Sequence, residues 1–425
     1  MTTAIIGGGA AGVAAAIAAT ECGQHVLVLE RNRKPLKKLG VTGNGRGNLL
    51  NSGASVYYGD AAFARDVLAG MGYPQLKAFF EGLGVPLRQE NEGWIYPAAL
   101  QAAVAVEALL LRAGQLGVTF LTNTRAESLT WENDGFIIHA LHTEPASETR
   151  GKTRTPAVER RETIRADRVI VTVGGAAAPA HGTDGTGYTL LTAFGHRLSP
   201  LKPALCALLT DPRRIAGLAG QRTRVTLTLV SPAGRTLKHT EGEVLFGDDA
   251  ISGIAAMQLA RFAEPGATLS IDMRPALALS GAEHSEMVAF LSRLAALRSD
   301  RTLGDLFTGA FAYPLARLIL RESGVGEPGA PIATLNAARM DRLAETIAAL
   351  RLPIAGTRGF EQAQVTAGGI VTEDFDPATL QSRLCPGLYA AGEVLDVDGD
   401  CGGFNLMFAF ASGLLAGRGS AHINE

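Results

Sequence analysis

The feature that most constrains the fold is a glycine pattern near the start of the chain, Gly7-x-Gly9-x-x-Gly12. A short apolar run at 3–6 precedes the pattern, and a segment of mostly alanine at 11–22 follows it. These lengths and compositions predict a strand that leads through a glycine turn into a helix. In this context the pattern is typical of a turn that binds a dinucleotide; the alternative is an alanine-rich packing helix without a ligand.

Each glycine has a separate task in such a turn. Gly7 permits the tight bend, Gly9 lets a pyrophosphate approach the backbone, and Gly12 lets helix and strand pack closely. The helix N-terminus then offers N–H groups and the positive end of its dipole to the phosphates. A second strand expected at 25–29 ends at Glu30, where a carboxylate can accept hydrogen bonds from an adenosine ribose.

The C-terminal region indicates which dinucleotide binds. A strand expected at 388–391 ends in Gly392-Glu393, and a glycine-rich loop then leads into an apolar helix from about Phe404. In FAD enzymes of the glutathione-reductase structural class, this carboxylate lies on the ribityl chain and the helix N-terminus points at the flavin pyrimidine ring. A further buried strand, which runs into a Gly-Gly turn at 169–175, fits the place where the chain crosses under such a cofactor. Together these features favour FAD.

With these motifs in place, the sequence resembles the BaiN/RdsA-type FAD-dependent oxidoreductases, also called YhiN-like flavoproteins or aminoacetone oxidases. The likeness covers nearly the whole chain, and the matching blocks occur in the family's order. The blocks are GGGAAG with Glu30, TGNGRGN, VTVGG, GTDGTGY followed by GHRLSPLKPAL, GEVLFGDDAISG, QVTAGGI and GLYAAGEVLDVDGDCGGFN.

The resemblance implies a role for the string GVTGNGRGNLLN, which carries no hydrophobic period. Residues Thr42 to Asn48 would wrap the phosphate and ribityl region of the flavin, with charge from Arg46 and hydrogen bonds from Asn44 and Asn48. The alternative for Arg46 is a solvated loop arginine. The resemblance also implies that the backbone near Ala126 meets the adenine.

The predicted FAD contacts come from both ends of the chain and from its middle. No metal site is expected, because the cysteines form neither a CxxC pair nor another metal-binding spacing. The predicted FAD-binding residues are Gly7, Gly9, Ala10, Ala11, Gly12, Glu30, Arg31, Thr42, Gly43, Asn44, Arg46, Asn48, Ala126, Thr172, Gly174, Gly175, Gly392, Glu393, Gly403, Phe404, Asn405 and Leu406.

The predicted fold class is α/β: a doubly wound, Rossmann-like FAD-binding domain of the glutathione-reductase class, interrupted by a β-barrel-like insert that carries a helical subdomain. The insert is expected to begin near residue 200, and the strictly alternating run 224–230 indicates an antiparallel sheet or barrel in it. Amphipathic helices are expected at 281–297 and 336–350. The block at 365–370 is expected beside the cofactor. The expected domains are 1–199 with 358–425 for FAD, 200–275 with 345–357 for the insert, and 276–344 for the helices.

Within the FAD domain, a helix is expected at 101–112 and a strand at 118–122. A strand at 135–141 is expected to form a hairpin with the strand before Val169. The charged, aperiodic segment between them, 142–163, is expected to be a mobile surface excursion with solvated basic residues.

Only one dinucleotide fingerprint follows a strand, because the glycine-rich run at 182–187 follows a loop. We therefore expect NAD(P)H to dock transiently and to pass hydride to the flavin. The resemblance implies that reduced flavin would then reduce an activated C=C bond in a small or medium apolar substrate, with a nearby acid protonating the adjacent carbon. The alternatives are a flavin amine oxidase that produces hydrogen peroxide and a non-catalytic FAD-binding protein.

The sequence departs from the family's pattern at several positions, which puts the substrate in doubt. Gly47 stands where the family has Cys, and Trp94 stands where it has Arg. The block at 246–253 lacks the family's His. Cys401 is expected to be a small filler in place of Thr, although a redox or covalent role is left open.

The catalytic candidates are Asp248, Asp249 and Tyr96. Two apposed carboxylates raise the pKa of one of them, so the aspartates could supply a general acid or bind an amine, but a solvated turn is the alternative. Tyr96 is a second candidate proton donor, against the alternative of a core aromatic residue.

The totals exclude several classes of protein. Of 425 residues, 47% are hydrophobic and 19% are charged, which indicates a globular protein. Lys plus Arg number 39 against 41 for Asp plus Glu, so a nucleic-acid partner is not expected. The apolar N-terminus lacks a basic region and carries glycines, so we expect neither a signal peptide nor a membrane span, and a cytoplasmic location. The oligomeric state is left open.

Overall fold

The computed structural model of the chain describes residues 1–54, 56–90, 93–144, 146 and 157–421. It divides into two compact units, Met1–Lys202 with Gln364–Glu425, and Pro203–Ala363. The expected domain boundaries lie at 199/200 and 357/358, a few residues before the boundaries of these units. The helices expected to form a separate subdomain belong to the second unit, and their separation as a domain stays a prediction.

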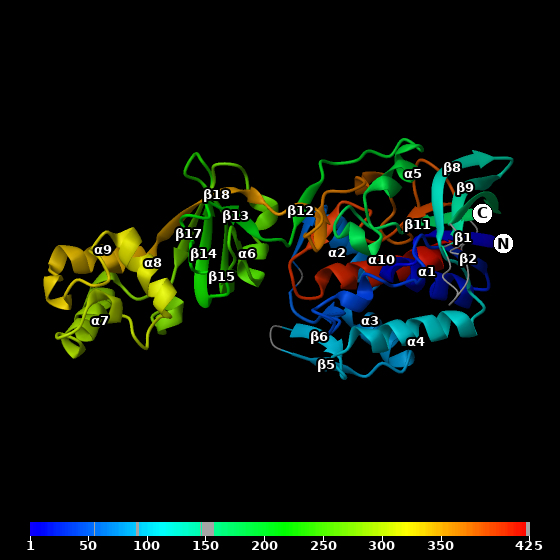
Figure 1. Ribbon diagram of the computed structural model, residues 1–425. Helices are drawn as coiled ribbons and strands as arrows, with labels where there is room; N and C mark the ends of the chain where they lie inside the picture. Colours follow the sequence, from blue (N-terminus) through cyan, green and yellow to red (C-terminus); the bar gives the residue numbers. More distant parts are fainter. Residues whose placement is uncertain (55, 91–92, 145, 147–156, 422–425) are drawn as a thin grey trace, which may run out of the picture. The chain divides into compact units, whose positions relative to one another are not determined.

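The first unit contains most of the labelled elements of Figure 1. Its elements are β1 (Thr2–Ile6), α1 (Ala10–Glu21), β2 (His25–Leu29), β3 (Leu50–Asn51), β4 (Tyr57–Gly59), α2 (Ala61–Gly70), α3 (Tyr73–Gly82), β5 (Leu87–Gln89), β6 (Trp94–Pro97), α4 (Ala102–Gln115), β7 (Thr119–Leu121), β8 (Thr124–Glu132), β9 (Gly135–Glu144), β10 (Val158–Ala166), β11 (Arg168–Val171), α5 (Thr189–Thr192), β19 (Val365–Ala367), β20 (Leu388–Ala390), β21 (Val397–Gly399) and α10 (Phe404–Gly419).

A parallel sheet forms the centre of this unit, in the order β20-β11-β1-β2-β7. The register pairs Ile5 with Ile170 on one side and with Val28 on the other. These strands are apolar because both faces of the sheet are covered, as in other doubly wound folds. The predicted α/β class with a Rossmann-like domain is confirmed, and the strand expected at 25–29 has the expected bounds.

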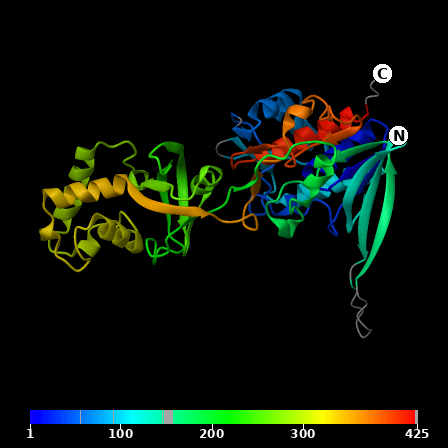
Figure 2. The same ribbon diagram turned by 90° about the horizontal axis from the view of Figure 1, so that it is seen from above.

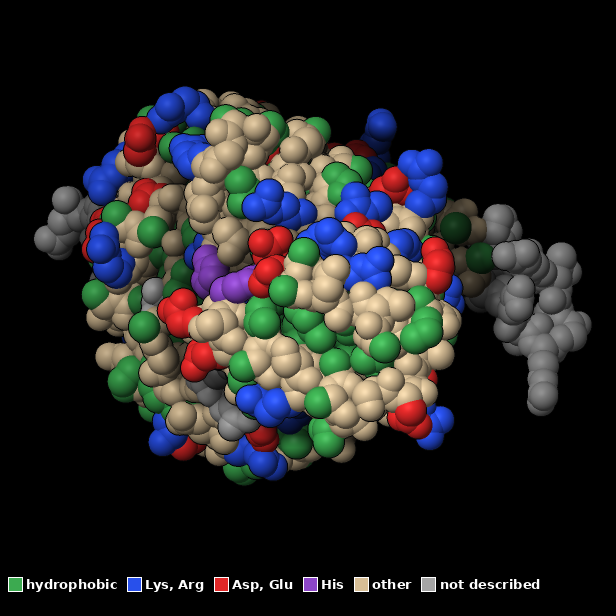
Figure 3. Space-filling model, turned by 90° about the vertical axis from the view of Figure 1, so that its left-hand side faces the viewer, with side chains coloured by type: hydrophobic (Ala, Val, Ile, Leu, Met, Phe, Trp, Pro, Cys, Tyr) green, Lys and Arg blue, Asp and Glu red, His purple; other side chains and the backbone are tan. Residues whose placement is uncertain are grey.

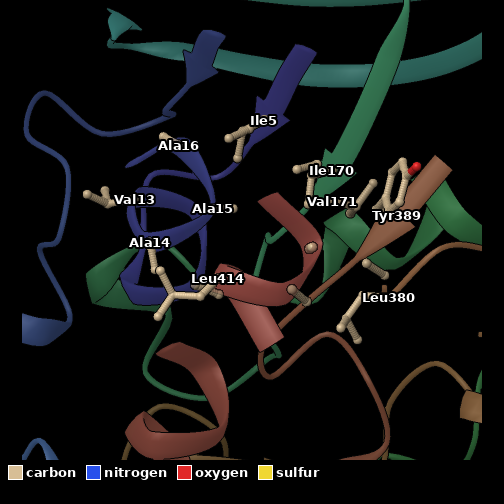
Figure 4. Close-up of a cluster of buried hydrophobic side chains, with 14 of the residues drawn as sticks. Ile5, Val13, Ala14, Ala15, Ala16, Ile170, Val171, Leu380, Tyr389 and Leu414 are labelled. Atoms are coloured by element: carbon tan, nitrogen blue, oxygen red, sulfur yellow. The ribbon is translucent and has the colours of Figure 1, made fainter. Parts of the chain in front are cut away.

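Two helices from opposite ends of the chain pack together against this sheet. The α1 helix is buried almost all round, and so is α10, so neither shows an amphipathic pattern. Figure 4 shows Leu414 of α10 directed at Ala14 of α1. A Cβ atom at Gly413 would lie 2.3 Å from the carbonyl oxygen of Ala11, and one at Gly417 would lie 2.4 Å from that of Ala15. Glycine at both positions therefore lets the two backbones approach closely.

An antiparallel sheet, in the order β10-β9-β8, lies at one side of the first unit, as Figure 2 shows. The expected hairpin is present, but the two strands are longer than predicted. Residues 142–144 and 158–163, expected in a surface excursion, belong to β9 and β10, where Val158 pairs with Glu144. These strand ends carry polar side chains on both faces, so the sequence has no alternation of apolar and polar residues there to indicate a strand. Backbone hydrogen bonds between β9 and β10 nevertheless pair them. The rest of the excursion, apart from residues 146 and 157, lies outside the described residues.

The second unit is built on a closed barrel in the order β13-β16-β15-β14-β17-β18. The expected β-barrel insert is therefore confirmed. Its elements are β13 (Leu208–Thr210), β14 (Arg222–Val230), β15 (Thr236–Phe246), β16 (Ala250–Ser252), α6 (Ile254–Met257), β17 (Thr268–Asp272), α7 (His284–Leu297), α8 (Tyr313–Ser323), α9 (Ala337–Ala348) and β18 (Leu350–Thr357).

Two helices of the second unit, α7 and α9, begin at side-chain caps. The Asn336 side chain accepts a hydrogen bond from the Arg339 amide at 3.0 Å, and Glu283 forms a capping box with Glu286 at the start of α7. Leu350, expected at the end of a helix, instead begins β18. Figure 3 shows hydrophobic side chains gathered among charged ones on a face of this unit.

The close contact between α1 and α10 predicts a measurable cost for one added methyl group. We expect Gly413→Ala to lower the free energy of unfolding by about 1–3 kcal/mol, because the new Cβ atom meets backbone rather than a flexible side chain. Urea denaturation of the purified protein measures this. The matched control is Gly114→Ala in the exposed end of α4, where a Cβ atom meets nothing within 4 Å, and which should be neutral or stabilising by about 0.5–1 kcal/mol. Equal effects of both substitutions would contradict the close packing.

Candidate functional site

The candidate site lies at the carboxyl edge of the parallel sheet in the first unit. Four neighbouring strands, β20, β11, β1 and β2, end there and lead into Gly392, Thr172, Gly7 and Glu30. Ligands of open α/β sheets bind at this edge, because the strand ends and the helix N-termini meet there. Segments distant in the sequence thus come together at one place.

The three glycines of the first turn have distinct environments. Gly7 has a φ of +107°, and a Cβ atom there would lie 2.5 Å from the Thr172 carbonyl oxygen. A Cβ atom at Gly12 would lie 1.9 Å from the Gly7 carbonyl oxygen. At Gly9, by contrast, φ is −80° and a Cβ atom would meet nothing within 4 Å. Gly7 and Gly12 are required by the chain itself, whereas the space over Gly9 is open to a ligand.

The N-terminus of α1 is available to an anion. Within the described part of the chain, no side chain caps this helix, and its first turn contains no acidic residue. The amides of Ala10, Ala11 and Gly12 lie in this first turn, where N–H groups have no partner inside the helix. The positive end of the helix dipole adds to their attraction for a phosphate.

Glu30 is 6% exposed, and its carboxylate organises the turn. One oxygen accepts a hydrogen bond from the Gly8 amide at 2.8 Å, and the other accepts from the amide and the side chain of Asn32, both at 2.7 Å. An oxygen that accepts one such bond can accept a second from a ribose hydroxyl. Arg31, also predicted to bind FAD, forms an ion pair with Asp184 at 2.8 Å.

The glycine and asparagine loop at 42–48 has an unusual backbone. The residues Gly43, Asn44, Gly45 and Gly47 all have a positive φ, between 55° and 80°. Glycine adopts this conformation without strain and asparagine tolerates it, which explains the composition of the loop. The Thr42 side chain donates a hydrogen bond to the Leu39 carbonyl at 2.7 Å, which holds the start of the loop.

Arg46 and Asn48 both belong to this loop, and their side chains have different environments. The Arg46 guanidinium carbon lies 4.7 Å from the centre of the Tyr96 ring, and its Nη2 atom lies 3.7 Å from Glu90 Oε1. The Asn48 Oδ1 atom is buried and has no hydrogen-bond partner among the described residues. It lies 2.8 Å from the place where a Cβ atom of Gly403 would be, beside the first turn of α10.

The carboxylate of Glu393 lies next to the ends of β11 and β20. Its Oε1 atom accepts a hydrogen bond from the Thr366 amide at 2.8 Å, and its Oε2 atom pairs with Lys38 Nζ at 2.9 Å. Thr366 is part of the block expected beside the cofactor. Lys38 was not predicted, because in the sequence it belongs to a charged run, Arg33 to Lys38, that looks like a solvated surface.

The turn after β11 is tightly packed. Thr172 donates a hydrogen bond to the Gly7 carbonyl at 2.8 Å, so its side chain fastens the two turns together. Gly174 has a φ of +74°, and a Cβ atom at Gly175 would lie 2.4 Å from Thr366 Oγ1 and 3.1 Å from Glu393 Oε1. Gly175 therefore lets the backbone approach the Glu393 carboxylate, whereas Gly174 supplies the left-handed conformation of the turn.

The N-terminus of α10 is the second one at the site without a side-chain cap among the described residues. Gly403 precedes it with a φ of +97°, and Phe404 and Leu406 lie in its first turn. The Asn405 side chain accepts a hydrogen bond from the Gly399 amide and donates one to the Gly399 carbonyl, both at 2.8 Å. These two bonds hold the loop before the helix, and the backbone N–H of Asn405 lies in the first turn of α10. Ala126 lies in β8, next to a β-bulge opposite β9.

The catalytic candidates lie in different units. Tyr96 is in β6 of the first unit and is 4% exposed. Its pKa is raised because burial disfavours the charged phenolate, and the Arg46 guanidinium offsets part of this rise. Asp248 is exposed, and Asp249 forms an ion pair with Arg358 within the second unit. The structure thus gives Asp249 a structural partner, and the catalytic role of each candidate stays a prediction.

These residues fit FAD as their ligand. The space over Gly9, the unpartnered Asn48 Oδ1 atom and two helix N-termini supply what an elongated dinucleotide needs: room, polar partners and two ends of positive potential. In the searched part of the chain, no three His, Cys, Asp or Glu side chains gather as metal ligands. Among the helices of the described residues, none has the length and apolar character needed to cross a membrane.

Comparison with known proteins identifies the family. A family model described as "HI0933-like protein Rossmann domain" matches residues 1–419. The chain belongs to this HI0933-like family. A protein named 3-dehydro-bile acid delta(4,6)-reductase, from Clostridium scindens, is 37% identical over 435 residues, which cover 98% of this chain and 98% of its own. The resemblance to the BaiN/RdsA-type enzymes is thus confirmed, and the enzyme class is that of an FAD-dependent oxidoreductase.

More distant members of the HI0933-like family carry another name. A ribosomal RNA dihydrouridine synthase from Escherichia coli is 26% identical over 96% of this chain and 95% of its own. The protein of the same name from Haemophilus influenzae is 24% identical over the same shares of the two chains.

Alanine is expected to have different effects at Gly9 and at Gly12, because the space beside the two residues differs. We expect Gly9→Ala to leave the stability of the apoprotein unchanged, because the conformation suits alanine and the space is open, but to weaken FAD binding by about 10-fold or more. We expect Gly12→Ala to disrupt the fold. Thermal unfolding of the apoprotein and fluorescence titration with FAD measure the two effects. Normal FAD affinity in the Gly9 variant would show that the pyrophosphate does not pass over this residue.

Proposed function

We propose that this protein reduces an activated C=C bond in a small or medium apolar substrate, with NAD(P)H as a transient electron donor. The observation that carries the proposal is the likeness, over 98% of both chains, to a protein named 3-dehydro-bile acid delta(4,6)-reductase. The dihydrouridine synthase name of the distant relatives also denotes the reduction of a double bond. A C=C bond conjugated to a carbonyl group is the chemical feature that these names share.

Two groups of site residues would bind the two ends of FAD. The α1 turn with Gly9 and Glu30 would hold the pyrophosphate and the adenosine ribose, and Glu393 would hold the ribityl chain. The α10 N-terminus, with Asn48 beside it, would meet the pyrimidine ring and stabilise negative charge there. Bound FAD supplies a hydride from its N5 atom when it is reduced.

The electron donor is proposed from the single dinucleotide turn. The second glycine-rich run, at 182–187, connects the 3-10 turns Pro179–His181 and Thr186–Tyr188, and its Asp184 pairs with Arg31. It does not follow a strand directly, so it lacks the geometry of a second nucleotide-binding turn. A nicotinamide nucleotide would therefore dock, reduce the flavin and leave.

Tyr96 is the proposed proton donor to the carbon next to the site of hydride addition. It is buried in β6, and the raised pKa keeps its phenol protonated in the neutral range. Asp248 and Asp249 remain the alternative proton donors.

Anaerobic reduction separates the proposed reaction from its alternatives. We expect NADPH or NADH to bleach the flavin absorption of the purified protein, and a cyclic enone to restore it without oxygen. Peroxide formation with small amines and air would instead indicate an oxidase, and a flavin that resists every donor would indicate a non-catalytic role. Tight RNA binding at low salt, with no enone turnover, would favour the activity named for the distant relatives.

A conservative substitution tests the proton donor. We expect Tyr96→Phe to lower kcat for enone reduction about 10²–10⁴-fold, because the ring remains but the proton is lost. Since the phenol acts in its protonated form and its pKa is raised, wild-type activity should persist through neutral pH and fall only above about pH 10. Tyr73→Phe, a tyrosine at the start of α3, is the matched control. Unchanged kcat in the Tyr96 variant would transfer the role to another acid.

A further inference from the structure

The Arg46 guanidinium has hydrogen-bond donors that its contacts within the described residues do not use. Its contacts within the described residues are the Tyr96 ring, at 4.7 Å from the guanidinium carbon, and Glu90 Oε1 at 3.7 Å. Glu90 makes a shorter ion pair, at 2.8 Å, with Arg88. The Arg46 side chain is 44% exposed, and a guanidinium has five N–H donors, so donors remain open to a ligand.

The surroundings place this cation at the α10 end of the site. Trp94 and Tyr96 are two residues apart in β6, so their side chains lie on the same face of the strand. The Trp94 indole nitrogen lies 2.6 Å from where a Cβ atom of Gly402 would be, and Cys401 is near enough to Tyr96 to influence its pKa. Gly402 directly precedes the turn that begins α10. The contacts of Arg46 thus lead to the helix end proposed for the flavin ring, and none of them is to the α1 turn proposed for the pyrophosphate.

The local charge favours an oxygen that becomes negative. Arg46 and Arg88 carry two positive charges, and Glu90 carries one negative charge, which leaves one positive charge in the group. A guanidinium stacked on an aromatic ring is held in its orientation, and its planar N–H groups match a planar acceptor. The Trp94 and Tyr96 side chains add flat apolar surface on the same face of β6.

We propose that Arg46 binds the carbonyl oxygen of an α,β-unsaturated ketone, with the Tyr96 ring as the platform that orients the guanidinium. This inference rests on the proposed function and assigns Arg46 to the substrate in place of the flavin phosphate. Bound, reduced FAD would supply the hydride that the β-carbon of the enone takes up, and the π electrons of the C=C bond would leave negative charge on the carbonyl oxygen. Arg46 donates hydrogen bonds to this oxygen, and the α-carbon takes the phenol proton of Tyr96, so that the saturated ketone forms.

The substrate class follows from this geometry. An isolated alkene offers no oxygen to the guanidinium and no route for the negative charge, so it should not be reduced. A ring ketone conjugated to the double bond offers both, and its flat face suits the two aromatic side chains. The proposal thus predicts selection by the carbonyl group ahead of selection by overall size.

The test compares binding of cofactor and substrate in the same variants. We use Arg46→Ala and Arg46→Lys, with Arg112→Ala as the matched control, because Arg112 of α4 is also a partly exposed arginine and pairs with Glu21, at 2.7 Å, outside the proposed site. The probes are 2-cyclohexen-1-one and 4-androstene-3,17-dione, the latter labelled with ¹³C at the C3 carbonyl. FAD affinity is measured by fluorescence titration of apoprotein, enone affinity by the visible spectrum of the oxidised enzyme, and the carbonyl bond by infrared difference spectroscopy.

In wild type, we expect the carbonyl stretch of the bound enone to shift to lower frequency. Arg46→Ala should abolish this shift and raise the enone dissociation constant about 10- to 100-fold, the range for a lost hydrogen bond to a charged group, while FAD affinity changes less than about 2-fold. Arg46→Lys should restore part of the affinity, and Arg112→Ala should resemble wild type.

Different results overturn different statements. A loss of FAD affinity in Arg46→Ala, with enone binding intact, assigns the residue to the phosphate and ends the proposal. An unchanged carbonyl band in that variant ends it as well. If no enone binds the wild-type enzyme or reoxidises its reduced flavin, the proposed function itself fails, and the role of Arg46 in it fails too.

Discussion

The first unit depends on the close packing of α1 against α10. Gly413 and Gly417 bring the backbone of α10 within contact distance of the Ala11 and Ala15 carbonyl groups, and alanines line the facing side of α1. The two helices come from opposite ends of the chain. This packing therefore places at one site two helix N-termini that are almost four hundred residues apart in the sequence. The strands β1 and β20 are held in one sheet by the intervening β11. A single elongated ligand can therefore contact the turns at both ends of the chain.

The same packing explains why glycine is concentrated around the site. Gly7 and Gly12 are needed for backbone to meet backbone, and Gly392 meets the Ala11 side chain, where a Cβ atom would lie 2.9 Å away. Gly9 differs, since no atom of the described residues occupies the space beside it. This contrast separates glycines that build the fold from one that serves a ligand. It gives the expected FAD site a physical basis independent of any likeness to other proteins.

Charged side chains at the site are held by partners within the chain before any ligand arrives. Glu30 accepts bonds from Gly8 and Asn32, and Glu393 pairs with Lys38 and Thr366. Such contacts fix the orientation of the carboxylates, so that less freedom is lost on binding. Arg46 differs because its partner Glu90 is shared with Arg88 and because most of its donors remain available. For this reason Arg46 can bind a group outside the chain, as proposed for the carbonyl oxygen of the substrate.

The sequence by itself determined the first βαβ unit, the family, the barrel and the order of the blocks. The βαβ unit and the barrel follow from local signals: apolar runs of strand length, glycines between them and strict alternation from Arg224 to Val230. The family and the order of the blocks follow from the resemblance of whole sequence blocks to a known family. The sequence did not reveal the polar ends of β9 and β10, the α8 helix or the role of Lys38, because a charged side chain looks the same in a sequence whether it is solvated or paired. Only the tertiary structure decided that Arg46 lies over Tyr96 and that Asp249 pairs with Arg358. Such pairings join residues far apart in the chain, and no local pattern of residue types encodes them.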